Sequence, residues 1–170
     1  MCGVIGVLGT PQASRRVLQG LQLLQHRGQD AAGILSHDEF GFHSIKNLGL
    51  VESVFPKNFS EVLTGNVAIG HVRYSTVPKN SSQSSGSELT NVQPFLTNFP
   101  FGIGLAHNGN LSNFEDLALH LRSKVRRHPL TRSDSETILN LFAESLANET
   151  REETLSFRHI CEAVKNVFKN

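Results

Sequence analysis

The change of hydrophobic period along the chain limits its fold more than any other feature. Short apolar runs between glycines and turn residues fill the first two-thirds and predict strands, at residues 3–9, 31–36, 41–46, 67–74 and 101–107. Apolar residues at helical spacing predict helices, at residues 13–25, 113–124, 134–147 and 154–168. A strand-rich region followed by a helical last third indicates an α+β fold.

Several shorter stretches carry local signals. Residues 78–88 combine five serines with proline and glycine, so we expect a mobile loop within the domain. Ser133 is the predicted N-cap of the helix at 134–147, with Glu136 at the capping-box position. Residues 48–55 fit either a short helix or the end of a strand.

Length and charge exclude several classes of protein. A chain of 170 residues corresponds to one domain as a first expectation. Lys and Arg number 16 against 15 Asp and Glu, a net charge of +1, which argues against a nucleic-acid or membrane-surface partner. The sequence has no apolar run of about 20 residues and no secretory signal at its start, so we expect a cytoplasmic protein.

The two cysteines differ in their surroundings. Cys161 lies in the apolar stripe of the last predicted helix, where we expect a buried structural thiol. Cys2 follows the initiator methionine, and cysteine is small enough for aminopeptidase to remove Met1. An N-terminal cysteine carries its own base, because its α-amino group (pKa about 7.7) can take the thiol proton. A second-position cysteine also occurs by chance, so both interpretations stay open.

Three other places offer groups for acyl transfer on an amino acid. Asn108 and Gly109 follow a predicted strand and could stabilise an oxyanion, or form a plain hairpin turn. Arg73 could bind a carboxylate in a fork. Asp134 could pair with an ammonium group, or simply stabilise the start of a helix.

Metal and nucleotide sites are not expected. The eight histidines show no paired ligand spacing, and the glycine-rich run from Gly3 to Gly9 lacks the G-x-G-x-x-G pattern. We therefore expect no metal and no cofactor in this chain.

Taken together, these segments form an ordered series of motifs. They are Cys2-Gly3, His26-Arg27-Gly28-Gln29-Asp30, Gly70-His71-Val72-Arg73-Tyr74-Ser75-Thr76, Gln93-Pro94-Phe95, Ala106-His107-Asn108-Gly109-Asn110-Leu111 and Ser133-Asp134-Ser135-Glu136. The series resembles the class II glutamine amidotransferases, which are N-terminal-nucleophile hydrolases. Gln29, Tyr74 and the Gln93-Pro94-Phe95 motif make the chain most similar to the glutaminase domains of the amidophosphoribosyltransferases of purine synthesis.

The resemblance implies a role for each matching residue in catalysis. Cys2 would attack the side-chain amide of glutamine, form a thioester and release ammonia. Asn108 and Gly109 would form the oxyanion hole. His26 and Arg27 would serve as scaffolding around the nucleophile.

It also implies roles in substrate binding. Arg73 would bind the α-carboxylate of glutamine, with Thr76 close by, and Asp134 would bind the α-ammonium group. Tyr74 and the loop after it would close over the site. That loop, residues 77–92, is longer and richer in serine than is usual in the family.

The implied fold is a four-layer αββα sandwich, incomplete at its C-terminal end. Residues 1–170 would then be a truncated glutaminase domain whose partners are glutamine and an ammonia-accepting phosphoribosyltransferase domain that this chain lacks. A homo-oligomer stays open. The alternatives are a non-catalytic remnant or regulatory partner, and the glutaminase domain of another class II amidotransferase.

The N-terminal nucleophile generates a first prediction. Protein purified from cells should have an intact mass that lacks Met1 and an N-terminal sequence that begins at Cys2, both readable by mass spectrometry. Retention of Met1 in most of the protein would contradict the proposed use of the α-amino group.

Overall fold

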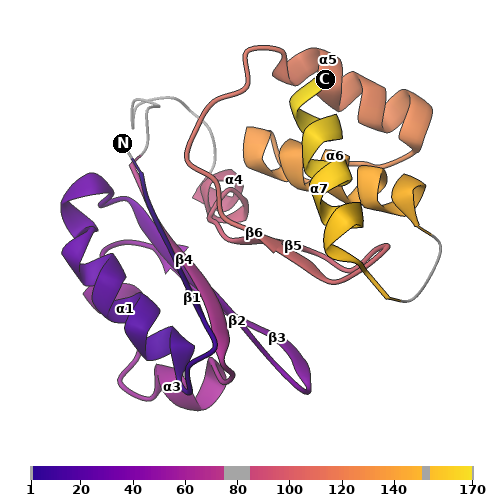
Figure 1. The fold of residues 1–170 in the computed structure, drawn as a ribbon. Coiled ribbons are helices and arrows are strands. Elements are labelled where there is room, and N and C mark those ends of the chain that lie inside the picture. The colour runs from indigo at the N-terminus through magenta and orange to yellow at the C-terminus, as the bar shows by residue number, and fades with distance from the viewer. Residues whose placement is uncertain (1, 75–84, 151–153, 170) are drawn as a thin grey trace. The chain divides into compact units, whose positions relative to one another are not determined.

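The computed structural model describes residues 2–74, 85–150 and 154–169. Its contacts group into two compact units. The first contains residues 1–94 and 105–109, and the second contains residues 95–104 and 110–170. Helices and antiparallel strands are mixed along the chain, which confirms the expected α+β class (Figure 1).

The first unit is built on a four-stranded antiparallel sheet in the order β1-β4-β2-β3. Its strands are β1 (Gly3–Leu8), β2 (Ala31–Asp38), β3 (Gly41–Leu48) and β4 (Val67–Arg73). All four were expected from the sequence, with ends that differ by one or two residues. The pairing of β1 with β4 brings the first residues of the chain beside a strand some 70 positions later, with Gly3 opposite Val72.

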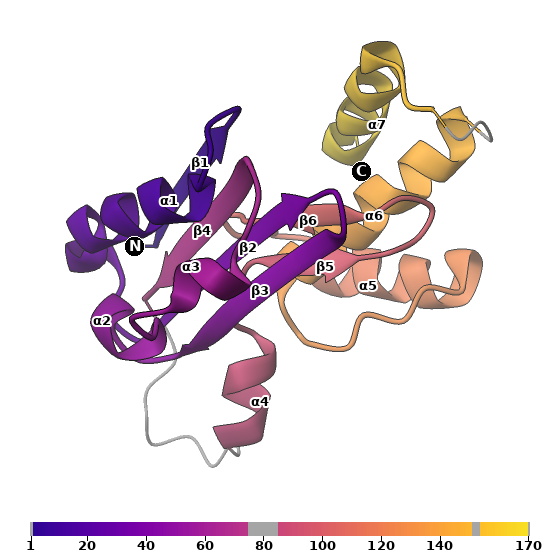
Figure 2. The same ribbon diagram turned by 90° about the horizontal axis from the view of Figure 1, so that it is seen from below.

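Helix α1 (Ala13–Leu23) covers one face of this sheet (Figures 1 and 2). Val17 and Leu21 of the helix are fully buried against Ile34 and Val72 of the sheet. Gly70 permits this close packing, because a Cβ there would collide with the side chain of Val17. The 3-10 turn η1 (Gln25–Arg27) follows the helix.

Short helices complete the core of the first unit. Residues 48–55 resolve as the end of β3 and helix α2 (Val51–Val54), and α3 (Phe59–Val62) follows. Val51, Phe59 and Leu63 join the cluster under α1, and the Ser14 hydroxyl donates to the Leu63 carbonyl at 2.6 Å. Residues 48–55, whose sequence fits either a short helix or a strand end, therefore contribute Val51 to the core through helix α2.

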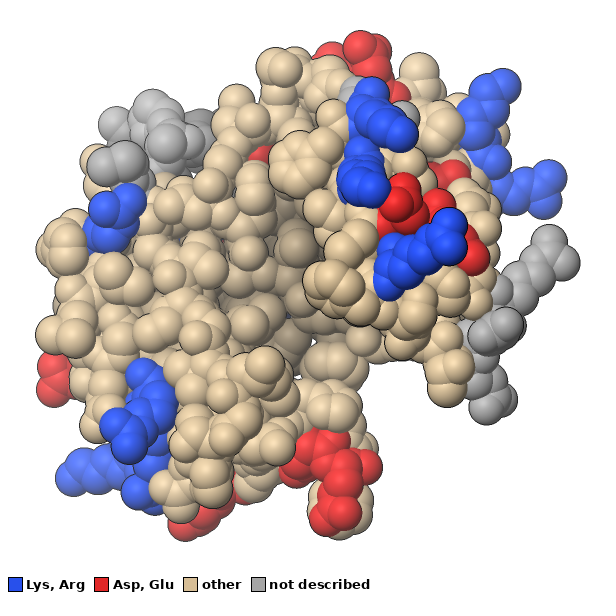
Figure 3. Space-filling model, in the orientation of Figure 1, with Lys and Arg blue, Asp and Glu red and all other residues tan. Residues whose placement is uncertain are grey.

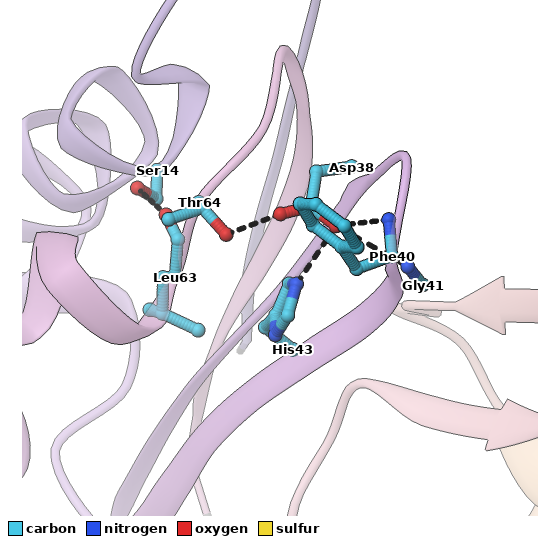
Figure 4. A network of polar contacts seen from close by, with 7 residues as sticks. All are labelled: Ser14, Asp38, Phe40, Gly41, His43, Leu63 and Thr64. Carbon is cyan, nitrogen blue, oxygen red and sulfur yellow. Dashed lines mark hydrogen bonds and ion pairs between the residues drawn. The ribbon is translucent and has the colours of Figure 1, made fainter.

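Asp38 organises the turn between β2 and β3 (Figure 4). Its carboxylate accepts hydrogen bonds from the Thr64 hydroxyl at 2.5 Å and from the backbone N–H groups of Phe40 and Gly41, and it pairs with His43 at 3.0 Å. The Thr64 hydrogen bond, followed by the His43 contact, holds the pKa of Asp38 well below its usual range.

The second unit is mainly helical. It contains β5 (Phe95–Thr97), paired with β6 (Ile103–Leu105, whose last residue belongs to the first unit), then α5 (Phe114–His120), α6 (Asp134–Glu149) and α7 (Phe157–Lys169). A π-helical turn, η2 (Leu121–Val125), extends α5. Leu117, Leu121 and Leu141 form the centre of its core, with Val167 of α7 packed against them.

Two sequence expectations in the middle of the chain need correction. Part of the expected loop at 78–88 is helical, because α4 spans Ser85–Thr90, and residues 75–84 lie outside the described part. Serine and glutamate near a helix start favour such a turn, whereas the composition argument concerned only the ability to form a core. The strand expected at 101–107 is shorter, and its partner β5 was not expected.

The capping box expected at α6 does not form. Ser133 is the N-cap residue, but its side chain makes no capping hydrogen bond. The carboxylate of Glu136 instead accepts hydrogen bonds from the backbone N–H of Leu130 at 2.8 Å and from the N–H and hydroxyl of Thr131 at 2.7 Å. Glu136 therefore orders the loop before the helix rather than the helix start.

Helix α7 keeps an apolar face in contact with solvent. Ala163 is its one fully buried residue among the described positions, while Phe157 and Phe168 are 80% and 87% exposed. Cys161 is half-buried, so the expectation of a buried thiol is wrong. None of the helices in the described ranges is long and apolar enough to cross a membrane.

Charged side chains are mixed on the surface. On the face drawn in Figure 3, Lys and Arg side chains form small separate groups, some of them beside Asp and Glu. The exposed pair Lys165 and Glu162, 2.6 Å apart on α7, is one example. This distribution agrees with the near-zero net charge.

The Asp38 network generates a second prediction. Thr64→Val should lower the urea midpoint of unfolding at pH 7, because the carboxylate loses its strongest hydrogen bond, and Thr64→Ser should largely keep it. A carboxyl whose pKa is lowered by folding stabilises the protein above its unfolded pKa of about 3.9 and loses that contribution as the pH falls further. The difference between wild type and Thr64→Val should therefore shrink below pH ~4. A difference that is the same at pH 7 and in acid would contradict this account.

Candidate active site

Strand pairing fixes the surroundings of Cys2. The cysteine immediately precedes β1, whose first residue, Gly3, lies opposite Val72 of β4. Arg73 and Tyr74 follow Val72, and the Cys2 thiol donates to the Tyr74 carbonyl over 4.0 Å. The thiol is half-buried. The sheet thus places the candidate nucleophile at the end of the strand that carries Arg73.

Two side chains hold the backbone carbonyl of Cys2. Arg27 donates to it from Nε at 3.1 Å, and Asn108 donates to it from Nδ2 at 2.9 Å. These donors come from positions 25 and 106 residues away in the sequence. The structure therefore brings Cys2 together with the candidate oxyanion residue Asn108. The contact of Arg27 fits the scaffolding role expected for it.

The segment after η1 links Cys2 to the strand that carries Arg73. Asp30 donates its backbone N–H to the Arg73 carbonyl at 3.0 Å. Gly28 lies against the same strand end, since a Cβ there would sit 2.6 Å from the Val72 carbonyl carbon and 2.7 Å from that of Arg73. Arg27, which donates to the Cys2 carbonyl, therefore belongs to a segment that packs directly on β4.

Arg73 and Tyr74 are the described substrate-binding candidates of the first unit. The guanidinium of Arg73 is half-buried and donates to the Glu88 carbonyl of α4 at 3.5 Å. Tyr74 is 54% exposed at the end of the strand. Thr76 lies outside the described residues.

The turn with Asn108 and Gly109 is exposed at its tip but anchored at its base. The backbone N–H of His107 donates to the side-chain oxygen of Gln93 at 2.7 Å. Gly109 lies against the His107 ring, which a Cβ would approach within 2.5 Å. Sequence reasoning used Gln93 only as part of a motif, and its contact with this turn was not foreseen.

His71 is a buried neutral base next to this turn. It lies in β4 two residues before Arg73 and is 1% exposed. Burial lowers its pKa to about 4, with further lowering by the charges of Arg73 and His107. The imidazole is therefore uncharged at neutral pH and adds no second cation beside Arg73.

Asp134 belongs to the second unit. It is the first residue of α6, and its carboxylate accepts hydrogen bonds from the backbone N–H of Ser135 at 2.7 Å and of Leu111 at 3.2 Å. Leu111 comes three residues after Asn108 in the sequence. Asp134 therefore holds Leu111 to the start of α6 within the second unit.

Two bacterial proteins that are similar in sequence to this chain carry the same name. Amidophosphoribosyltransferase of Pseudomonas aeruginosa is 45% identical over 147 residues, which is 86% of this chain and 28% of that protein. The enzyme of the same name from Escherichia coli is 44% identical over 169 residues, 99% of this chain and 30% of that protein. No protein-family model matches.

Solved structures agree with the sequence relatives. Glutamine phosphoribosylpyrophosphate amidotransferase from B. subtilis, complexed with ADP and GMP, matches with a TM-score of 0.73 and 31% identity, over 97% of this chain and 32% of that one. A structure described as the allosteric regulatory enzyme of purine biosynthesis matches with a TM-score of 0.74 and 31% identity, over 97% of this chain and 33% of that one. The chain thus spans about a third of the length of the proteins it matches.

The fold and these relatives show that the chain corresponds to the N-terminal-nucleophile glutaminase region of the class II glutamine amidotransferases. Within that class, the chain is related to the amidophosphoribosyltransferases and corresponds to their N-terminal portion. The resemblance drawn from the ordered motifs is therefore confirmed.

The packing of Gly28 generates a third prediction. Gly28→Ala should lower the free energy of unfolding by about 1–3 kcal/mol, since the new methyl group meets backbone atoms of β4 that cannot turn away. Gly6→Ala is the matched control, because a Cβ there has its nearest contact at 3.7 Å. Urea titration measures both variants, and equal effects of the two would contradict the described packing.

Proposed function

We propose that this chain hydrolyses glutamine to glutamate and ammonia through a thioester on Cys2, as the ammonia-supplying part of an amidophosphoribosyltransferase in purine synthesis. The hydrogen bond of 2.9 Å from the Asn108 amide to the Cys2 carbonyl carries the proposal. This contact supports the placement of the nucleophile and the oxyanion donor at one site, since acyl transfer needs both groups around the carbonyl of the substrate.

The reaction begins at the two reactive groups of Cys2. With Met1 removed, its α-amino group accepts the thiol proton, directly or through one water molecule. The thiolate attacks the side-chain carbonyl carbon of glutamine, and the oxygen becomes an anion that Asn108 and Gly109 stabilise. The carbon–nitrogen bond then breaks, the proton passes to the leaving nitrogen, and ammonia departs from a thioester.

Hydrolysis of the thioester regenerates the enzyme. Water adds to the thioester carbon as the α-amino group takes a proton from it. The carbon–sulfur bond breaks, glutamate leaves, and the proton returns to the thiol. The proposed chemistry uses one thiol, one amine and two hydrogen-bond donors, and it requires neither a metal nor a cofactor.

Substrate recognition follows from the ends of glutamine. We assign the α-carboxylate to Arg73, with Thr76 next to it, and the α-ammonium group to Asp134, because opposite charges must face the zwitterion. Arg73 retains donors for a bidentate contact, since the guanidinium has five. Tyr74 and the residues after it would exclude water during the reaction.

The wider assembly is part of the same proposal. Residues 1–170 would belong to a four-layer αββα sandwich, and the ammonia would pass to a phosphoribosyltransferase domain such as the one carried by its longer relatives. Such an enzyme would act in the cytoplasm, although some plant relatives are named chloroplastic.

A second candidate rests on the exposed face of α7. Phe157, Ile160, Val164 and Phe168 lie on one side of this helix and are at least one-third exposed. Such a face favours an incompletely packed domain that acts as a non-catalytic or regulatory partner. The two candidates differ in the reactivity of Cys2 and in the packing of α7, because a cooperative thermal transition and protected amides in this helix would count against the remnant.

A fourth prediction separates these candidates. The glutamine analogue 6-diazo-5-oxo-norleucine should alkylate Cys2 once per chain, with loss of dinitrogen, and excess glutamine should block the reaction. Cys161→Ser should label like wild type, and Cys2→Ser should not label. Peptide mass spectrometry identifies the modified residue.

Two results would count against the enzymatic proposal. One is the absence of label in a protein that begins at Cys2. The other is labelling of Cys2→Ser at the wild-type rate.

A further inference from the structure

We propose that Gln93 is a positioning residue for the oxyanion-stabilising turn, an inference that rests on the proposed function. Its side chain is 8% exposed, and its Oε1 accepts a hydrogen bond of 2.7 Å from the backbone N–H of His107. His107 directly precedes Asn108 in the chain. Gln93 thus fixes the peptide group one residue before the proposed oxyanion donor.

Gln93 is itself fixed to the sheet through its backbone. The ammonium group of Lys46, on β3, donates to the carbonyls on either side of it, to Val92 at 2.8 Å and to Pro94 at 3.0 Å. The carbonyl of Gln93 lies over Gly33 of β2, where a Cβ would collide with it. These contacts hold three consecutive carbonyls against two neighbouring strands.

The turn needs such an anchor because burial does not hold it. Asn108 and Gly109 are exposed, so packing contributes little to their placement. Hydrogen bonds at both sides supply the restraint: Gln93 holds His107, and the Asn108 side chain reaches the Cys2 carbonyl. An oxyanion donor is effective only when it is held at hydrogen-bond distance from the developing charge. Gln93 therefore connects the sheet to the exposed turn and restrains the movement of the proposed oxyanion donor.

The role predicts a particular kinetic pattern. The described contacts of Gln93 are with the backbone of His107 and with the sheet, so its loss should weaken transition-state stabilisation more than substrate binding. Complete removal of an oxyanion donor typically costs 10²–10³ in kcat. Loosening the turn should cost less, about 10–100-fold, with KM for glutamine within about twofold of wild type.

Two variants of Gln93 separate this role from a general loss of structure. Gln93→Met has a similar length but lacks the oxygen that accepts the His107 hydrogen bond, whereas Gln93→Glu keeps an acceptor. Gln22→Met, on the exposed side of α1, is the matched control. We expect a 10–100-fold lower kcat for Gln93→Met, substantial recovery in Gln93→Glu, and no change in the control.

Alkylation of Cys2 by iodoacetamide provides the discriminating measurement. That reaction forms no oxyanion, so its rate should stay within about twofold in Gln93→Met while glutamine hydrolysis falls. Unchanged hydrolysis in Gln93→Met, or an equal loss of both reactions, would overturn the positioning role.

Hydrogen exchange at the His107 amide makes the test independent of catalysis. Its protection should drop in Gln93→Met and remain in Gln93→Glu. A wild-type chain that hydrolyses no glutamine would contradict the proposed function. Loss of protection of the His107 amide in Gln93→Met would then still support the link between Gln93 and the turn. Protection that is equal in all variants would overturn the inference even if the chain is active.

Discussion

The antiparallel pairing of β1 with β4 is the contact on which the rest of the candidate site depends. Gly3 lies opposite Val72, so the start of the chain and the strand end that carries Arg73 cannot shift separately. A slip of one residue would turn every side chain of β1 to the opposite face and would break the packing under α1. Burial of that face therefore specifies the position of Cys2, which directly precedes the paired residue Gly3.

The two faces of the four-stranded sheet pack against different segments of the first unit. One face carries the apolar residues that pack against α1 and provides most of the core of the first unit. The other carries Gly33 and His71, since residues alternate between faces along a strand. Gly33 leaves room for the backbone of Gln93, and the buried imidazole of His71 stays neutral because burial lowers its pKa. The face opposite α1 is thus the one against which Gln93, the residue bonded to the base of the Asn108 turn, packs.

Much of this arrangement could be predicted from the sequence, and the reason is physical. Helix α1 has a strong hydrophobic period, and β1 and β4 are apolar runs bounded by turn residues, so these patterns indicate which residues are buried. The π-turn after α5, the helix α4 and the strand β5 were missed because short elements depend on tertiary contacts rather than on their own pattern. The contact partner of Glu136 was missed for a similar reason, because a carboxylate can satisfy a loop as well as a helix end.

The site residues show the same limit. The ordered motifs named Cys2, Asn108 and Arg73, but they could not show that Arg27 and Asn108 meet at one carbonyl oxygen. That contact joins segments from three parts of the chain, and no local spacing encodes it. Gln93 belonged to a recognised motif, yet its role follows only from the position of its side chain.

The way Cys2 is held has a consequence for what a substitution at this position would change. Both anchors grip the main-chain carbonyl, which lies on the far side of the α-carbon from the amino group. These two contacts therefore do not depend on the identity of the side chain at position 2, and neither involves the thiol, which donates to the Tyr74 carbonyl. Replacement of the sulfur by oxygen at this position would change the reactive atom without removing either hydrogen bond to the carbonyl. Such a scaffold would hold a serine at position 2 in the same place, so the loss of reactivity expected for Cys2→Ser would reflect the missing thiol rather than a displaced backbone.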